Sequence, residues 1–349
     1  MVESKCVLLT GSTGVIGSAL RPQLAHHRVI SLTHRRQVGS ESVTGDLTQP
    51  RFGLQDDVYR ALTSTVDTVV HCAAVTDFTT GPEAVNSLNV AGTRRVADFV
   101  AEADARLIHV STAFVARAEL TRRSETREAA ARPEDYLDSK RAGEAVIRQS
   151  GVPAVIVRPS VVIGDSASGA MASFQGVHAI LGAVLRNRLP LVPFSPSSRV
   201  DVIPQDLVVA ALQSLVDSEV RAGEFWLTAG QRALTAGRMV ELCLEVADDL
   251  GLEVTPPRLV APDMVDRLIR PVFIDPLPRA ARRQFDDLMA MAALFAGADP
   301  FATSYGNQPI GSQQMDLPSA DWFEAAFRTS ATYLAHAKGV APETSGAAA

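Results

Sequence analysis

A phenol and an ammonium group stand four residues apart in the segment YLDSK, as Tyr136 and Lys140. Residues at this spacing share one face of an α-helix, so the two side chains would point the same way. A free tyrosine has a pKa of about 10, and a neighbouring ammonium ion favours the phenolate, so we expect Lys140 to lower the pKa of Tyr136. Such a tyrosine can exchange a proton with a carbonyl oxygen. The alternative is an exposed helix on which a Tyr and a Lys meet by chance.

A third polar group supports the chemical interpretation. Thr112 follows the apolar segment 107–110, which is typical of a buried strand. We predict that Thr112 orients a carbonyl that receives hydride, that Tyr136 protonates its oxygen, and that Lys140 tunes Tyr136 and binds a ribose. No metal site is predicted, because the three cysteines lie far apart and lack the spacing of metal ligands.

The segment VLLTGSTGVIG, residues 7–17, indicates where an anionic group would bind. A short apolar run is followed by glycines at positions 11, 14 and 17 and then by a helical pattern over 18–25. Backbone N–H groups and the dipole at such a helix start favour negative charge. Gly11 permits the turn, Gly14 lets a pyrophosphate approach, and Gly17 lets the helix pack on the sheet. An ordinary Gly-rich turn is the alternative.

Strands and helices alternate through the first half of the chain. Apolar strand patterns at 7–9, 28–33, 66–73, 107–110 and 152–157 are separated by helical patterns, among them 86–100 and 136–149. This alternation predicts an α/β fold with a doubly wound parallel sheet, the Rossmann architecture. Ligands bind at the carboxyl ends of such strands. Gly11, Ala73, Ser111 and Thr112 all fall at strand ends, so the sequence predicts one site at that edge.

The second strand ends on basic residues. The position about 20 residues beyond the first glycine, where an acid normally accepts the ribose hydroxyls of NAD, is Thr33, followed by His34, Arg35 and Arg36. A guanidinium can bind a 2′-phosphate through two charge-assisted hydrogen bonds, whereas a carboxylate would repel it. We therefore predict NADPH as the cofactor. The alternative is that these arginines form a solvated loop.

Composition restricts the class of protein. The 349 residues are 46% hydrophobic and 21% charged, with a formal net charge of −6. These values are typical of a globular protein and give no overall attraction to nucleic acid. No apolar run is long enough for a membrane span, and the chain begins almost directly with its first strand, so no signal peptide is predicted. We expect a cytoplasmic protein with reduced cysteines.

Beyond residue 164 the regular alternation fades. We predict a Rossmann domain over 1–164 to which 199–230 returns, a smaller C-terminal substrate-binding or lid subdomain from 165–198 and 231–340, and a flexible tail at 341–349. The apolar stretches 264–273 and 285–295 could line an acyl or aromatic pocket, or be simple core. The segment 116–133 mixes Arg and Glu, which is typical of a solvated loop and leaves open a dock for an acidic carrier protein.

The motifs GSTGVIG, HCAA, NVAGT, STAFV and YLDSK, in this order, resemble the extended short-chain dehydrogenase/reductases. GDLTQPRFGL (45–54), HCAAVTDF (71–78), VRPSVVIGD (157–165) and RVDVIPQDLV (199–208) are most similar to one branch of them. That branch contains the fatty acyl-CoA reductases and the thioester reductase domains of carboxylic acid reductases and carrier-protein assembly lines. The chain departs from the branch at Arg141, where a bulky apolar residue is usual.

This resemblance implies roles for individual residues. It implies catalysis by Thr112, Tyr136 and Lys140, with the last two also against the cofactor. The implied cofactor contacts are Gly11, Thr13, Gly14, Val15, Ile16 and Gly17 at the pyrophosphate, Arg35 with its neighbour His34 at the 2′-phosphate, Asp46 and Leu47 at the adenine, Ala73 and Ala74 at the ribose, Asn89 as a support, and Pro159 and Val162 on the nicotinamide side.

Together these observations predict an NADPH-dependent reductase that delivers hydride to a carbonyl-level substrate. The preferred substrate is an acyl thioester, on coenzyme A or a carrier protein, which is reduced to the aldehyde or the alcohol. One alternative is a ketoreductase acting on a small metabolite such as a polyketide. A nucleotide-sugar epimerase or dehydratase is a second, although Arg35 argues against it, and a regulatory protein without turnover is a third. The oligomeric state is left open.

Overall fold

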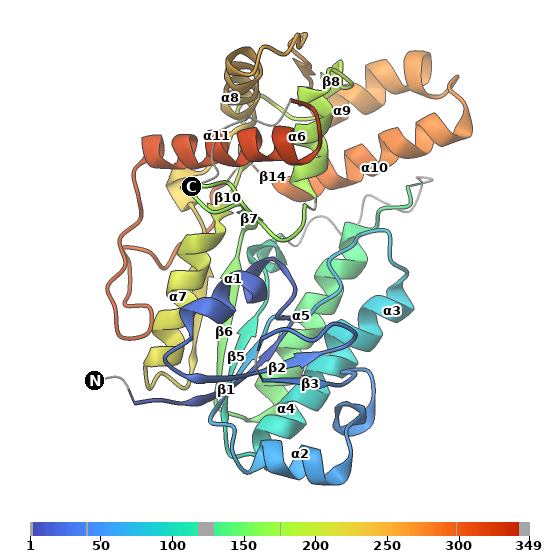
Figure 1. Ribbon diagram of the computed structural model, residues 1–349. Coiled ribbons are helices and arrows are strands. Elements are labelled where there is room, and N and C mark those ends of the chain that lie inside the picture. Colours follow the sequence, from blue (N-terminus) through green and yellow to red (C-terminus); the bar gives the residue numbers. More distant parts are fainter. Residues whose placement is uncertain (1–2, 40, 118–128, 175, 298, 342–349) are drawn as a thin grey trace.

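The computed structural model describes residues 3–39, 41–117, 129–174, 176–297 and 299–341. Its centre is a seven-stranded sheet in which every neighbouring pair is parallel (Figure 1). The strands, in spatial order, are β11 (Gly223–Leu227), β6 (Ala154–Pro159), β5 (Arg106–Val110), β4 (Thr68–His71), β1 (Cys6–Thr10), β2 (Arg28–Thr33) and β3 (Ser42–Thr44). The predicted Rossmann fold is confirmed.

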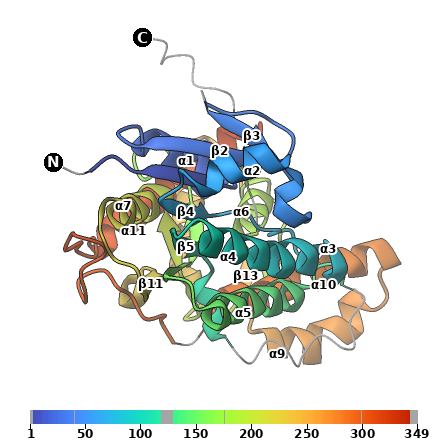
Figure 2. The same cartoon turned by 90° about the horizontal axis from the view of Figure 1, so that it is seen from below.

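Helices cover both faces of this sheet (Figures 1 and 2). β1 shows why, because Val7 and Leu9 belong to one apolar core while Cys6 and Leu8 belong to the other. A strand buried on both faces is expected to be almost continuously apolar, and residues 6–9 of this one are. One face carries α1 (Val15–Gln23) and α7 (Gln205–Asp217), and the other carries α2 (Asp56–Thr63), α4 (Thr93–Glu102) and α5 (Pro133–Ser150).

The helix predicted over 86–100 is divided into three parts. A short α3 (Pro82–Asn86) leads into a π-helical segment, η2 (Ser87–Gly92), and only then into α4. The Thr93 hydroxyl donates a hydrogen bond to the Asn89 carbonyl at 2.7 Å, across the junction of η2 and α4. π-Helical turns are frequent at functional sites. Hydrophobic spacing alone does not reveal such an insertion.

A second group of elements lies above the carboxyl ends of the strands (Figure 1). Its helices are α6 (Val177–Leu185), α8 (Ala236–Asp249), α9 (Pro262–Met264), the π-helix η6 (Val265–Ile274), α10 (Arg279–Phe295) and α11 (Ala320–Ala337). Short strands connect them: β7 (Val161–Ile163), β8 (Leu191–Val192), β9 (Arg199–Val200), β10 (Val202–Pro204), β12 (Leu234–Thr235), β13 (Arg258–Leu259) and β14 (Ala296–Gly297). Three 3₁₀ turns complete the described elements: η1 (Pro50–Gly53), η3 (Ala113–Ala116) and η5 (Gly230–Arg232).

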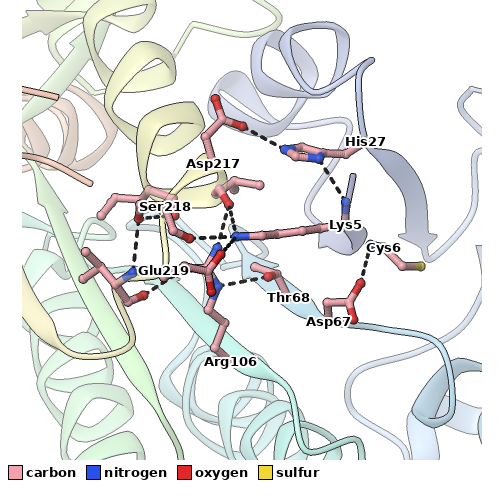
Figure 3. A network of polar contacts seen from close by, with 12 residues as sticks. Lys5, Cys6, His27, Asp67, Thr68, Arg106, Asp217, Ser218 and Glu219 are labelled. Atoms are coloured by element: carbon pink, nitrogen blue, oxygen red, sulfur yellow. Dashed lines mark hydrogen bonds and ion pairs between the residues drawn. The ribbon is translucent and has the colours of Figure 1, made fainter. Parts of the chain in front are cut away.

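α7 is fixed to the sheet at the opposite edge by a polar network (Figure 3). The Lys5 ammonium donates to the carbonyls of Val216 and Ser218 and pairs with Glu219. The Arg106 guanidinium, which is buried, donates to the Val216 carbonyl as well. These bonds satisfy carbonyls at the end of α7 that the helix itself leaves without a partner.

Among the described residues, no helix combines the length and the apolar character needed to cross a membrane.

Candidate active site

A cavity of about 260 Å³ opens between the carboxyl edge of the sheet and the C-terminal elements. Its lower wall is the glycine turn, and its side wall contains Thr112, Tyr136 and Lys140. The structure thus brings the predicted phosphate turn and the three predicted catalytic residues into one cavity. The other predicted residues that line it are Gly11, Gly14, Val15, Ile16, Gly17, Ala74, Pro159 and Val162.

The glycine turn has the close packing that a dinucleotide site requires. Gly11 has φ +71°, and a Cβ there would lie 2.6 Å from the Ala73 nitrogen. A Cβ on Gly17 would lie 2.3 Å from the Gly11 carbonyl oxygen. No other residue fits at these two positions without a shift of the backbone, so the start of α1 stays close to the strand ends. The turn therefore fits the pyrophosphate of a bound dinucleotide, held by backbone N–H groups at the helix start.

The three predicted catalytic residues come from two neighbouring elements. Thr112 follows β5 and caps η3, accepting a hydrogen bond from the Phe114 N–H at 3.4 Å. Tyr136 lies in the first turn of α5, and Lys140 lies one turn later. The Lys140 ammonium is buried and donates to the Val110 carbonyl, at the end of β5, at 2.8 Å. This bond joins α5 to the sheet and holds the ammonium at its carboxyl edge.

The protonation of Tyr136 differs from the sequence prediction. Burial raises its pKa to about 12, and a hydrogen bond with Thr112 opposes this shift only in part. Burial also lowers the pKa of Lys140 to about 8, against the attraction of Glu144. The predicted fall in the pKa of Tyr136 is therefore wrong for this structure, because the desolvation of the phenol outweighs its hydrogen bond with Thr112. At neutral pH Tyr136 is a proton donor.

Asn89 acts behind the cavity rather than in it. Its side-chain oxygen accepts from the Val75 N–H at 2.8 Å, and its amide nitrogen donates to the Val75 carbonyl at 3.0 Å and to the Ser139 hydroxyl at 2.9 Å. The Ser139 hydroxyl in turn donates to the Tyr136 carbonyl at 2.7 Å. Asn89 therefore joins the loop after β4 to the first turn of α5 and fixes the position of Tyr136.

The remaining predicted cofactor residues lie along the same edge of the sheet but outside the cavity lining. His34 and Arg35 are exposed directly after β2. Asp46 accepts hydrogen bonds from the N–H and the hydroxyl of Thr48, which lower its pKa against the opposing effect of burial. The last three are Leu47, which is buried, Thr13, which is exposed in the glycine turn, and Ala73, which packs on Gly11.

Several wall residues have no signal in the sequence. Phe78 lies 5.5 Å from the Tyr136 ring and 6.3 Å from the Phe295 ring, and Phe114 lies 5.9 Å from Phe295 (centroid distances). These aromatic side chains come from three distant segments, so only the tertiary fold brings them together. The other lining residues to which the sequence assigned no individual role are Thr76, Val110, Ser160 and Val161, and, within the predicted substrate-binding segment 165–198, Met171, Ser173, Gly176, Val177 and His178.

Of the two apolar stretches predicted to line a pocket, one reaches the cavity. Leu294 and Phe295 lie in its wall. The stretch 264–273 does not line it: Val265 is buried, whereas Val272 and Phe273 on η6 retain 62% and 66% of their accessible surface. The pocket role left open for 264–273 was therefore wrong, and Val265 fits the alternative of simple core. Residues 118–128, which hold most of the predicted carrier dock, and the tail from 342 lie outside the described residues.

Two neighbours of the site with reactive side chains are part of the core. Burial raises the pKa of the Cys72 thiol to about 12, so it is no nucleophile at neutral pH. His71 forms hydrogen bonds with the hydroxyls of Thr10 and Thr93, and burial lowers its pKa to about 3. Both side chains are therefore uncharged at neutral pH; Cys72 lies in the cavity lining, and His71 lies outside it.

A separate cluster of His26, His27 and Asp217 lies at the opposite edge of the sheet, partly visible in Figure 3. The Lys5 N–H donates to Nδ1 of His27, so the ring proton is on Nε2, which donates to Asp217 at 2.8 Å. A metal ion at Nε2 would displace that proton and leave both ring nitrogens without one. The cluster is therefore a hydrogen-bonded anchor for α7, a role that the sequence did not indicate.

Residues 24–212, more than half of the chain, match the NAD-binding family described as "Male sterility protein". The chain belongs to this family. It is a member of the extended short-chain dehydrogenase/reductases, whose fold and cofactor site are those of NAD(P)-dependent oxidoreductases. The resemblance inferred from the motifs is thereby confirmed.

Curated relatives from biosynthetic enzymes are similar to parts of the chain. The hybrid PKS-NRPS synthetase pvhA of Talaromyces variabilis is 28% identical over 228 residues, which are 60% of this chain and 6% of that protein. The ceramide reductase of Caulobacter vibrioides is 29% identical over 216 residues, or 59% of either chain. The matched part of this chain thus covers a small part of the length of the synthetase and little more than half of the length of the reductase.

The solved structures support the fold. The terminal R domain from the myxalamid PKS-NRPS biosynthetic pathway superposes with a TM-score of 0.69 over 98% of this chain and 94% of that one, at 21% identity. The reductase domain of a nonribosomal peptide synthetase from Mycobacterium tuberculosis superposes with a TM-score of 0.65 over 97% of this chain and 93% of that one, at 20% identity. At these identities the likeness establishes the shared architecture.

Proposed function

We propose that this family member is an NADPH-dependent reductase of acyl thioesters carried on coenzyme A or on a carrier protein. The observation that carries the proposal is the single cavity that unites the glycine turn with Thr112, Tyr136 and Lys140. The names of the relatives support the substrate class, because several are synthetases or reductase domains of assembly lines that use carrier-bound intermediates. We also infer that 1–164 and 199–230 hold the cofactor, that 165–198 and 231–340 hold the substrate, and that the protein is cytoplasmic.

The residues would share the work as follows. NADPH, when bound, supplies the hydride. The glycine turn holds its pyrophosphate, Lys140 its ribose, and Pro159 and Val162 its nicotinamide side. Thr112 donates a hydrogen bond to the substrate carbonyl oxygen, and Tyr136, whose pKa of about 12 keeps it protonated, donates the proton that balances the charge on that oxygen.

The reaction balances without a covalent enzyme intermediate. The carbonyl carbon gains hydride and becomes tetrahedral while its oxygen takes the proton of Tyr136. When the carbon–sulfur bond then breaks, that proton returns to Tyr136, and the sulfur leaves as a thiol with the one proton that the reaction takes from solvent. The products are an aldehyde, the free thiol and oxidised cofactor. A second hydride and proton would give the alcohol. Cys72 is not required, since its thiol stays protonated.

The decisive test replaces Tyr136 with Phe. General acid catalysis contributes roughly 10²- to 10⁴-fold, so kcat/KM for an acyl thioester should fall by at least ~100-fold while the NADPH dissociation constant stays within about threefold. Tyr59→Phe is the matched control, because it removes a buried phenol hydroxyl on α2, outside the cavity lining. Normal turnover in Tyr136→Phe would refute the proposal that Tyr136 donates the proton.

The choice of cofactor has its own test. Arg35→Glu should reverse the preference for NADPH over NADH by at least ~10-fold, because it replaces a cation with a repelling carboxylate. Arg60→Glu is the control: it makes the same change in net charge in the last turn of α2, before β4 begins. It should leave the preference for NADPH over NADH unchanged. An unaltered preference in Arg35→Glu would assign the 2′-phosphate to another residue.

A substrate panel separates the rival functions. NADPH absorbance is followed with acyl-CoAs, acyl carrier thioesters, aldehydes and aromatic ketones. Oxidation by a thioester supports the proposal, whereas oxidation by a ketone alone would make the protein a ketoreductase with the same three residues. Tightly bound NAD⁺ in the purified protein, with no reaction on the panel, would favour a nucleotide-sugar epimerase or dehydratase.

A further inference from the structure

Part of the lining of the active-site cavity is apolar: Phe78, Phe114 and Phe295 lie there with Val177 and Leu294, and we call these five side chains the apolar wall. The polar residues Thr76, Ser160, Ser173 and His178 also line the cavity. The Phe78 ring contacts the Tyr136 ring, so this wall begins at the atoms where the carbonyl would react. A substrate whose carbonyl oxygen is at Tyr136 therefore directs the rest of its acyl group along an apolar surface.

A second cavity of about 30 Å³ lies behind this wall. Every side chain that lines it is apolar: Val177, Ile180, Leu181, Val184, Val192, Phe194, Val200, Ala236, Met239, Val240 and Cys243. A cavity of this volume has room for one methyl or methylene group, and one without polar partners does not hold water. Its chemistry therefore suits saturated hydrocarbon and no other part of a thioester.

Val177 lines both cavities. It is the first residue of α6, and its side chain is buried. The preceding Gly176 has φ +52°, and a Cβ there would lie 2.6 Å from the Phe295 ring. The start of α6 is thus packed directly on the aromatic wall, which places the Val177 side chain between the two cavities.

We propose that the small cavity receives the methyl end of a straight alkyl chain and that Val177 and Cys243 set the length of chain accepted. The ligand class is an unbranched saturated acyl group. The proposal rests on the acyl substrate proposed above, and it names the part of the molecule that selects among such substrates. Cys243, on α8, lines the small cavity and not the active-site cavity, so it can be changed without contact with the reacting atoms.

The first experiment measures kcat/KM for straight-chain acyl-CoAs from butanoyl to hexadecanoyl. Cys243→Met extends a side chain into the small cavity. For the long substrates only, kcat/KM should fall about fourfold for each methylene of the acyl chain that the methionine excludes from the cavity. Val177→Ala should move the preferred chain length upward. Cys6→Met is the matched control, since the same change on β1 lies outside both cavities.

A second measurement separates this proposal from the proposed function. The dissociation constants of n-alkanols from butanol to dodecanol are determined by calorimetry for the same variants, which needs no turnover. If affinity rises with alkanol length in the parent, and Cys243→Met stops that rise at a shorter alkanol, the acyl site is supported even if no thioester is reduced. The proposal would be overturned if the dependence of the dissociation constant on alkanol length were the same for the parent, Val177→Ala and Cys243→Met, with NADPH binding intact. A uniform loss for all chain lengths in Cys243→Met would overturn it as well.

Discussion

Asp201 provides a stability prediction with a defined sign. It lies between β9 and β10, is 2% exposed, and accepts hydrogen bonds from the N–H groups of Ala229 and Gly230 at 2.9 and 3.0 Å. Burial raises the pKa of this carboxyl to about 6, although the two N–H groups and the nearby Arg117 act in the opposite direction. The folded protein therefore binds a proton at Asp201 at a pH where the unfolded chain does not.

The magnitude follows from the shift. The usual pKa is 3.8, so the difference is about 2.2 (6 minus 3.8), and at 1.36 kcal/mol per unit it amounts to roughly 3 kcal/mol. Between pH 3.8 and 6 the folded state holds the extra proton, so the contribution of Asp201 to stability falls as the pH rises and is constant above pH 6. Asp201→Asn removes this dependence, whatever it does to the absolute stability.

Urea denaturation from pH 4 to 7 measures the effect. The difference in unfolding free energy between parent and Asp201→Asn should change by ~3 kcal/mol over this range, with the parent relatively more stable at the acid end. Asp165→Asn is the control, since hydrogen bonds from Ser168 and Ala167 lower the pKa of Asp165 despite its partial burial, so its contribution changes only below pH 3.8. A difference that stays constant with pH for Asp201→Asn would refute the claim that burial raises the pKa of this carboxyl.

Three further outcomes are expected. Gly17→Ala places a Cβ 2.3 Å from the Gly11 carbonyl oxygen, so the NADPH dissociation constant should rise at least ~10-fold and the protein should lose about 1–3 kcal/mol, measured by fluorescence titration and urea unfolding. Glu144→Gln replaces the carboxylate that accepts two hydrogen bonds from the buried Arg158, at 2.8 and 2.7 Å, while the Arg158 ion pair with Glu224 at 2.6 Å remains. It should cost about 1–3 kcal/mol of stability, and an unchanged free energy of unfolding would contradict this. Burial lowers the pKa of Lys140 from 10.5 to about 8, so stability should rise as the pH increases from 8 to 10, and Lys140→Met should lose that rise.

The parts of the fold that the sequence predicted correctly depend on local rules. The run from Val7 to Leu9 is apolar on both faces and is therefore a central parallel strand, and the glycines after it have too little space for any side chain. Tyr136 and Lys140 lie one helical turn apart, so their common face follows from spacing alone. Each of these inferences needs only residues that are close in the chain.

The errors concern properties that depend on distant residues. The pKa of Tyr136 rises because Phe78 and other distant side chains remove water from the phenol, which spacing on one helix does not show. The stretch 264–273 has the composition of a pocket wall, but three of its large apolar side chains, Leu268, Val272 and Phe273, are exposed on η6. The same apolar pattern can face a cavity or solvent, and only the packing of the neighbouring elements decides between them.

The protonation states of the site bear on the direction of the proposed reaction. A reductase requires a group that gives a proton to the carbonyl oxygen, whereas an alcohol oxidase of the same fold requires a phenolate that takes one. With its pKa at about 12, Tyr136 is almost fully protonated at neutral pH, and Lys140, at about 8, is still mostly charged. The charge that develops on the substrate oxygen during hydride addition would then meet a phenol and a nearby cation, and both stabilise it. In the proposed reaction Lys140 would therefore assist by its charge near the oxyanion rather than by turning Tyr136 into a base, and a protonated Tyr136 fits the proton-donor role that a reduction requires.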